Sequence, residues 1–99
     1  MIGEISVVPV GSDATSMRDY VQDAVGAIRG TGILFRVTEM GTNVEGSLDE
    51  ILRAFRAAHD ACLSRGAGRV LATLRIDDRV DQPEKLESAP ADSRGAAWH

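Results

Sequence analysis

A glycine-flanked carboxylate is the feature of this chain most suited to binding a small molecule. Glu45 ends a short run that begins with Met40 and Gly41, and Gly46 follows it directly. Glycine weakens a strand through lost packing and extra chain entropy, so two glycines beside one carboxylate indicate that something approaches the backbone closely there. An ionised carboxylate accepts hydrogen bonds and offsets positive charge. Glu45 is therefore either a contact for a cationic or amino-bearing ligand or a solvated strand residue.

Polar side chains near Glu45 extend this candidate site. Thr42 and Asn43 add hydrogen-bond donors and acceptors, although either side chain can equally stabilise a turn. Asp13 and Thr15, in the loop before the first expected helix, are candidates for an opposite wall, with local bonding to the loop backbone as the alternative. The two loops that precede the helices are thus the candidate functional surface.

Two residues with reactive side chains lie together on the second expected helix. His59 falls on its apolar stripe between Phe55 and Cys62, with no further ligand at metal-binding spacing. A buried histidine bonded to a backbone or hydroxyl group is expected there, ahead of acid–base chemistry or ligand contact. Cys62 has no CxxC partner and is expected to be a small buried hydrophobe. The sequence predicts no catalytic residue, no metal and no cofactor.

Composition places the chain among ordinary globular domains. Its 99 residues make one domain, and a formal net charge of -4 gives no reason to expect a nucleic-acid partner. The start, Met1-Ile-Gly-Glu4, has no basic segment and no long apolar run, which argues against a secretory signal or a membrane span. We therefore expect a cytoplasmic protein with no membrane partner.

The hydrophobic patterns predict the order strand, helix, strand, strand, helix, strand. Short β-branched or alternating segments mark strands over residues 4–10, 33–38, 41–45 and 69–76, and helical spacing marks apolar stripes over residues 16–28 and 48–63. The first helix is expected to end at Gly30 to Gly32, and the second at Gly66 or Gly68. Ser16 with Asp19, and Ser47 with Glu50, have the spacing of capping boxes. Beyond Arg79 the composition turns polar, which predicts a folded domain over residues 1–79 and a disordered tail over residues 80–99.

This element order predicts an α+β, ferredoxin-like βαββαβ sandwich. Because crossovers are right-handed, two split units interleave into a four-stranded antiparallel sheet with both helices on one face. The other face is left bare and carries Leu34, Leu71 and either Val7 or Val8 among polar residues. A half-apolar sheet face usually finds a partner, so we expect at least a homodimer.

Four segments of the chain carry a resemblance to a known family. They are Ser6–Gly11 with Thr15-Ser16, then Met40–Gly46 with Leu48-Asp-Glu50, then Ala58-His59, and finally Ile76–Arg79. Over residues 3–79 the chain resembles the thiamine-binding-protein-like family, also called the MTH1187/YkoF-like group. The resemblance implies a ferredoxin-like fold, dimers that join sheets and often pair into tetramers, and binding of thiamine or its hydroxymethylpyrimidine part without catalysis. It also implies a ligand-binding set of Thr15, Met40, Gly41, Thr42, Asn43, Glu45, Ser47 and His59.

Two other functions stay open at this point. A small cofactor-independent enzyme would need His59 to face a cavity. A structural or regulatory oligomeric module would instead be indicated by a convex, empty surface over residues 40–47.

Overall fold

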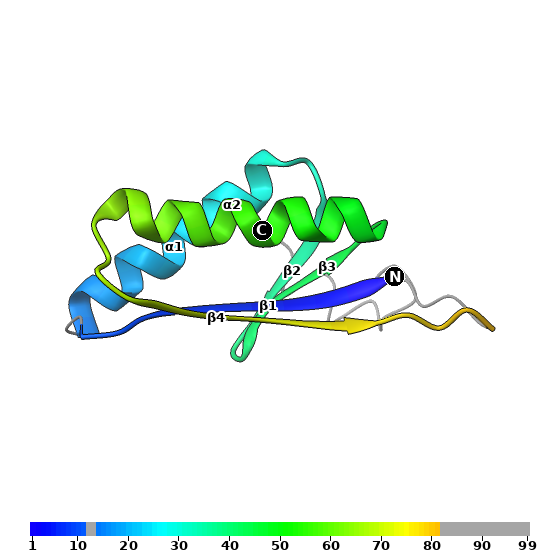
Figure 1. The fold of residues 1–99 in the computed structure, drawn as a ribbon, viewed down its shortest axis with the longest axis horizontal. Helices are drawn as coiled ribbons and strands as arrows, with labels where there is room; N and C mark the ends of the chain where they lie inside the picture. Colours follow the sequence, from blue (N-terminus) through cyan, green and yellow to red (C-terminus); the bar gives the residue numbers. More distant parts are fainter. Residues whose placement is uncertain (12–13, 82–99) are drawn as a thin grey trace.

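The structure is a computed structural model that describes residues 1–11 and 14–81, apart from the side chains of residues 14–16. Its elements are β1 (Ile2–Pro9), α1 (Ala14–Gly30), β2 (Leu34–Thr38), β3 (Gly41–Glu45), α2 (Leu48–Arg65) and β4 (Val70–Asp77) (Figure 1). The tail expected over residues 80–99 lies almost wholly outside the described residues.

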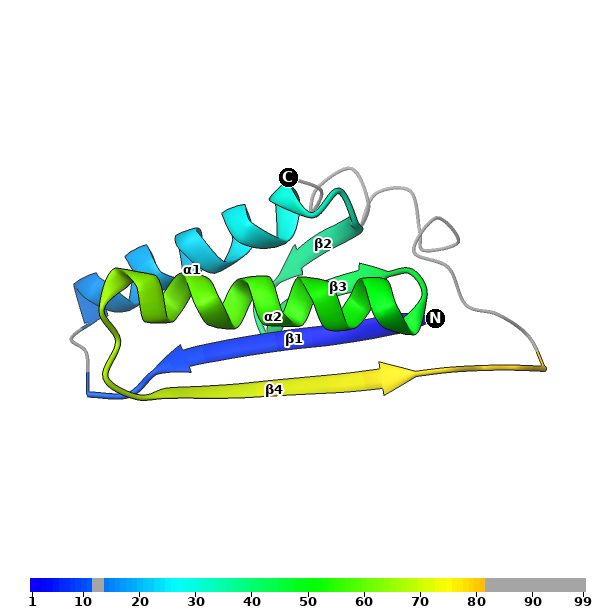
Figure 2. The same cartoon turned by 45° about the horizontal axis from the view of Figure 1, so that its top comes forward.

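One four-stranded sheet in the order β2-β3-β1-β4 forms the base of the molecule, and each neighbouring pair of strands is antiparallel. Both helices lie on the same face of this sheet (Figures 1 and 2). The ferredoxin-like α+β architecture is confirmed. It follows from two βαβ halves whose strands interleave, as right-handed crossovers require.

The second helix begins and ends as the sequence predicts. Ser47 accepts a hydrogen bond from the Glu50 N–H at 3.2 Å, and the Glu50 carboxylate accepts one from the Ser47 N–H at 2.9 Å. These bonds lower the pKa of Glu50. Gly66 ends the helix with φ 109°, a conformation that glycine adopts without strain. The capping box expected at Ser16 is wrong, because α1 begins at Ala14 and Ser16 lies within its first turn.

The core lies between the sheet and the two helices. Tight packing is clearest where α2 crosses the sheet, since a side chain added at Gly3 would lie 3.0 Å from Ile51. Cys62 is buried as expected, and burial raises the pKa of its thiol. The fully or nearly fully buried apolar residues are Ile5, Tyr20, Ala24, Ile28, Ile33, Phe35, Val44, Ile51, Ala54, Ala58 and Cys62.

The face of the sheet opposite the helices is open. Val8 is paired with Leu71 across β1 and β4, and both side chains are exposed on this open face, as is Leu34. Strand alternation puts Val7 on the helix side, so the valine of the open face is Val8. An ion pair of 3.7 Å joins Glu4 to Arg75 there. No helix of the described residues is long and apolar enough to cross a membrane.

Candidate binding site

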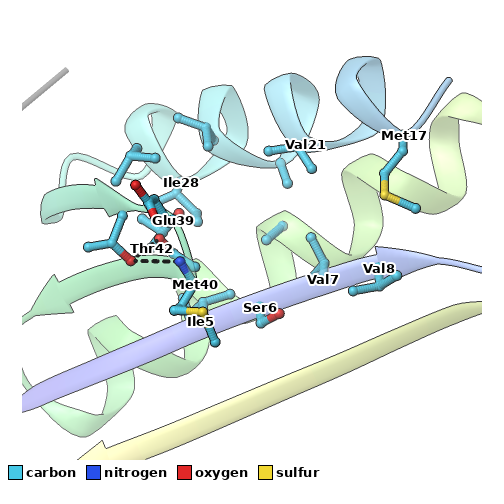
Figure 3. Close-up of a pocket in the computed structure, with 16 residues that line it drawn as sticks. Ile5, Ser6, Val7, Val8, Met17, Val21, Ile28, Glu39, Met40 and Thr42 are labelled. Carbon is cyan, nitrogen blue, oxygen red and sulfur yellow. Dashed lines mark hydrogen bonds between the residues drawn. The ribbon is translucent and has the colours of Figure 1, made fainter. Parts of the chain in front are cut away.

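A cavity of about 210 Å³ opens between α1 and one end of β1 (Figure 3). The cavity exists because the hairpin of β2 and β3 is shorter than β1, the strand beside it. β3 pairs only with Ile2–Ile5, whereas β1 continues to Pro9 with β4 as its neighbour. The second half of β1 therefore has an edge that no described strand covers, and α1 extends over it (Figure 2). The lining residues are Ile5, Ser6, Val7, Val8, Met17, Val21, Ala24, Val25, Ile28, Val37, Thr38, Glu39, Met40, Gly41, Thr42 and Ala58.

Apolar side chains surround the cavity and line most of its wall. Met40 is 77% exposed at the hairpin turn, and Met17 and Val21 are also exposed. Met17 and Val21 belong to the apolar stripe predicted over residues 16–28, which as a single stripe is expected to be buried. That expectation is wrong for these two residues, because the short hairpin leaves their part of the helix without a covering strand. Apolar side chains that remain exposed around a concavity are typical of a binding site.

Thr42 places a buried hydroxyl in the cavity wall. Thr42 as a whole residue is 5% exposed, and it is the buried polar residue of the described core. Its hydroxyl makes no hydrogen bond with the described residues. Buried polar groups nearly always have a partner, so an unpaired hydroxyl at a cavity is a feature that a ligand would satisfy.

The backbone of β1 offers further polar groups along the same cavity. The Ile5 carbonyl oxygen points at β3, since a Cβ added at Gly41 would lie 2.6 Å from it. Carbonyl and N–H directions alternate along a strand, so the N–H and C=O of Val7 point to that same side, beyond the end of β3. Pro9 has no N–H to offer. Val7 thus presents one donor and one acceptor side by side at the open edge.

The hairpin turn that closes one end of the cavity is held by a threonine. The Thr38 hydroxyl donates to the Gly41 carbonyl at 2.9 Å and accepts from the Met40 N–H at 3.3 Å. Such side-chain bonds are what Thr contributes to turns. Figure 3 shows Glu39 and Met40 at this end, with Met17 toward the other.

The two glycines of the central motif have structural neighbours. Gly41 packs on the Ile5 backbone, and a side chain at Gly46 would meet Glu50 of the capping box at 3.1 Å. The close approach expected at these glycines is thus made by the protein itself, by β1 and by the first turn of α2.

The predicted ligand-binding residues do not converge within one chain. Met40, Gly41 and Thr42 line the cavity. Asn43 and Glu45 do not, because the alternation of β3 turns one side chain toward the helices and the next toward the open face. Glu45 pairs in register with Ile2 and Leu34 on that open face. A binding role for these two residues stays a prediction, separate from the cavity.

The remaining predicted residues lie elsewhere. Ser47 caps α2 at the far end of β3, where its hydroxyl and N–H are both used by Glu50. Thr15 lies in the first turn of α1, and its side chain is outside the described set, as is the whole of Asp13.

His59 is not the buried histidine that the sequence indicates. Its side chain is 42% exposed, and its Nδ1 lies 3.5 Å from a carboxylate oxygen of Asp60. The buried stripe of α2 passes through Ala54, Ala58 and Cys62 instead, and His59 lies beside it. His59 does not line the cavity. No cluster of three metal-ligating side chains occurs among residues 1–11 and 14–81.

A charged cluster lies on the opposite side of α1, between the two helices. Arg65 donates from Nε and from Nη2 to the two carboxylate oxygens of Asp23, the second bond being 3.2 Å. Arg65 also lies 3.9 Å from Asp19 and 5.9 Å from the centre of the Tyr20 ring. These bonds lower the pKa of Asp23 and raise that of Arg65. The cluster links α1 to α2 through side chains that do not line the cavity.

Several cavity residues were missed by the motif-based interpretation. They include Ser6, Val7 and Val8 of β1 and Glu39 of the turn. One signal was present in the sequence, since the strands predicted for the hairpin are shorter than the first strand. A shorter hairpin must leave part of its neighbour's edge unpaired.

Comparison with known proteins decides the family. A profile of the thiamine-binding protein family matches residues 3–92. The chain belongs to this family. The match runs past Arg79, where the resemblance drawn from the motifs ends.

Relatives and solved structures agree with this assignment. A UPF0045 protein of Methanothermobacter thermautotrophicus is 43% identical over 84 residues, which are 84% of this chain and 85% of that protein. The crystal structure of the hypothetical protein MJ1052 from Methanocaldococcus jannaschii is 37% identical and has a TM-score of 0.79, with 87% of each chain covered. A candidate thiamine biosynthesis/salvage protein of Thermotoga maritima is 25% identical with a TM-score of 0.74, covering 89% of this chain and 92% of that one.

Proposed function

We propose that this protein binds thiamine or its hydroxymethylpyrimidine part without transforming it, and that the ligand's ring enters the cavity between α1 and the open edge of β1. The observation that carries this proposal is the buried Thr42 hydroxyl, which has no hydrogen-bond partner among the described residues and lies in the cavity wall. Membership of the thiamine-binding protein family supports the ligand class. The candidate role of the similar Thermotoga maritima protein, in thiamine biosynthesis or salvage, is consistent with this class.

The size and polarity of the cavity favour a single flat ring. Pockets that enclose drug-sized molecules have volumes of about 300–1,000 Å³, and this cavity measures about 210 Å³. An aminopyrimidine presents a ring nitrogen that accepts and an exocyclic amine that donates. The Val7 N–H and C=O are the complementary pair, and the Thr42 hydroxyl is free to bond a further ring substituent.

The chemistry of the wall favours binding over catalysis. Ser6 and Glu39 are the described lining residues of types that act as nucleophiles or bases, and no histidine, cysteine or lysine accompanies them in the described wall. His59, which the enzyme alternative requires, lies outside the cavity. The concavity at Met40–Thr42 also gives no support to a purely structural module, which a convex surface there would have favoured.

We further propose that the chain acts as a cytoplasmic homo-oligomer, a dimer or tetramer, joined through the open sheet face. The exposed apolar pair of Val8 and Leu71, with Leu34 across the sheet, supports this partner. Asn43 and Glu45 lie on the same face, so a second copy would cover the part of the central motif that the cavity leaves out.

Isothermal titration with thiamine and with hydroxymethylpyrimidine tests the proposal. We expect saturable binding of at least one of them, and chromatography of the recovered ligand should show it unchanged. The isosteric variant Thr42→Val should bind more weakly than the unmodified protein. Absence of heat at millimolar ligand would contradict the binding function, and consumption of the ligand would contradict its non-enzymatic character.

A further inference from the structure

Glu39 is the single ionisable side chain among the described residues that line the cavity. It lies on the turn between β2 and β3, exposed to solvent, at the end of the cavity where Met40 also projects (Figure 3). It makes no ion pair or hydrogen bond with any residue of the described ranges. The other lining residues are apolar or carry only hydroxyl groups, so nothing in the described wall neutralises this charge.

The turn that carries Glu39 is fixed in place. The two hydrogen bonds of Thr38 close the turn, and Gly41 packs directly on the Ile5 carbonyl of β1. A carboxylate on a rigid turn loses less conformational freedom when it meets a ligand than one on a flexible loop. Apolar walls with one sign of charge at the mouth also focus the electric field there. A cation at the mouth of this cavity would therefore meet a carboxylate that has no counter-ion among the described lining residues.

We propose that Glu39 makes the cavity selective for ligands that carry a positive charge next to a flat ring, and that it faces this charge when the ring is bound. The inference rests on the proposed function and names the chemical class that the same site prefers. Thiamine carries a permanently cationic ring beside its pyrimidine, whereas hydroxymethylpyrimidine alone is uncharged under mildly alkaline conditions. The central motif assigns the cation contact to Glu45, but Glu45 lies on the other face of the sheet from the cavity.

The test compares both ligands by isothermal titration in mildly alkaline buffer, with the full-length protein and the variant Glu39→Gln. Glu39 is exposed, so the expected effect is that of a solvent-screened pair, a loss of about three- to fivefold in affinity for thiamine. The affinity for hydroxymethylpyrimidine should not change. The thiamine affinity of the unmodified protein should fall with added salt, and this salt dependence should weaken in Glu39→Gln. Asp78→Asn is the matched control, because it removes the same charge beyond the distant end of β4.

Three results would overturn the inference while leaving the binding function intact. They are equal losses for both ligands in Glu39→Gln, no loss for either, or a selective loss of thiamine binding in Glu45→Gln instead. If the unmodified protein binds neither ligand, the proposed function fails. The preference of the cavity for a positive charge is then tested by NMR titration with the cation N-benzylpyridinium and with the uncharged 4-benzylpyridine. A preference for N-benzylpyridinium that disappears in Glu39→Gln would support the proposed charge selectivity. Equal binding of the two compounds, or binding of neither, would contradict it.

Discussion

Replacing Thr42 with valine should make the protein more stable and a weaker binder. The residue is 5% exposed and its hydroxyl has no partner among the described residues. Burying a hydroxyl without a hydrogen bond costs about 1–3 kcal/mol. We use the lower end, because the cavity opens to solvent beside Met40. Valine has nearly the same shape, so the free energy of unfolding should rise by about 1 kcal/mol, which for a domain of this size raises Tm by about 4–8 °C.

The control for this experiment is Thr38→Val in the neighbouring turn. That hydroxyl donates to Gly41 at 2.9 Å and accepts from the Met40 N–H, so its loss should lower the free energy of unfolding by about 1 kcal/mol. Urea titrations of both variants measure the two opposite changes. Titration calorimetry should show that Thr42→Val weakens ligand binding roughly two- to tenfold, the value of one neutral hydrogen bond. If Thr42→Val is destabilised as much as Thr38→Val, the hydroxyl is bonded in the folded protein and the reasoning about the cavity is wrong.

Three other changes test separate parts of the structure. Gly41→Ala should destabilise the fold by about 2 kcal/mol, because its Cβ would lie 2.6 Å from the Ile5 carbonyl oxygen; a urea midpoint within error of the parent would contradict this packing. Leu71→Asp puts a charge on the open face, so light scattering should show a shift toward monomer, and an unchanged mass would remove this face from the interface. The folded-state pKa of Asp23 is lowered by Arg65, so its contribution to stability is present above the ordinary carboxyl pKa and is lost as pH falls through the lowered value. The difference in unfolding free energy between the parent and Asp23→Asn should therefore be constant near neutral pH and shrink below about pH 4, and a difference independent of pH would argue against the ion pair.

Local patterns in the sequence were sufficient to predict the elements and their order. The capping box of Ser47 and Glu50 is a signal confined to four residues, and the hairpin of β2 and β3 follows from alternation on both sides of a tight connection. The start of α1 was misplaced, because Ser16 and Asp19 have the spacing of a cap without being one. Such a pattern shows only what a segment is able to form.

The site was harder to predict, because it depends on pairing between distant segments. The motif from Met40 to Gly46 was interpreted as one surface, yet a strand turns alternate residues to opposite faces. Thr42 and Glu45 are therefore separated by the sheet itself, a consequence that the period of the strand already implied. The choice between Val7 and Val8 for the open face needed the side of β1 that the helices cover, which the buried Ile5 identifies in the fold and no local pattern contains.

The cavity and the cost of leaving Thr42 unpaired have the same origin. If the hairpin were as long as β1, the second half of β1 would be covered, and the apolar side chains of α1 above it would be buried in an ordinary core. The pairing of β3 with β1 ends at Ile5 instead, and the turn closed by Thr38 and Gly41 fixes the end of the hairpin there. The fold thereby gives up packing and one hydrogen bond at a single place, where an open strand edge and an anionic turn meet. Stability given up at a concave site is typical of function, since a ligand recovers it on binding. A thiamine-like ring that restores both the packing and the hydrogen bond should therefore raise the stability of the parent protein more than that of Thr42→Val.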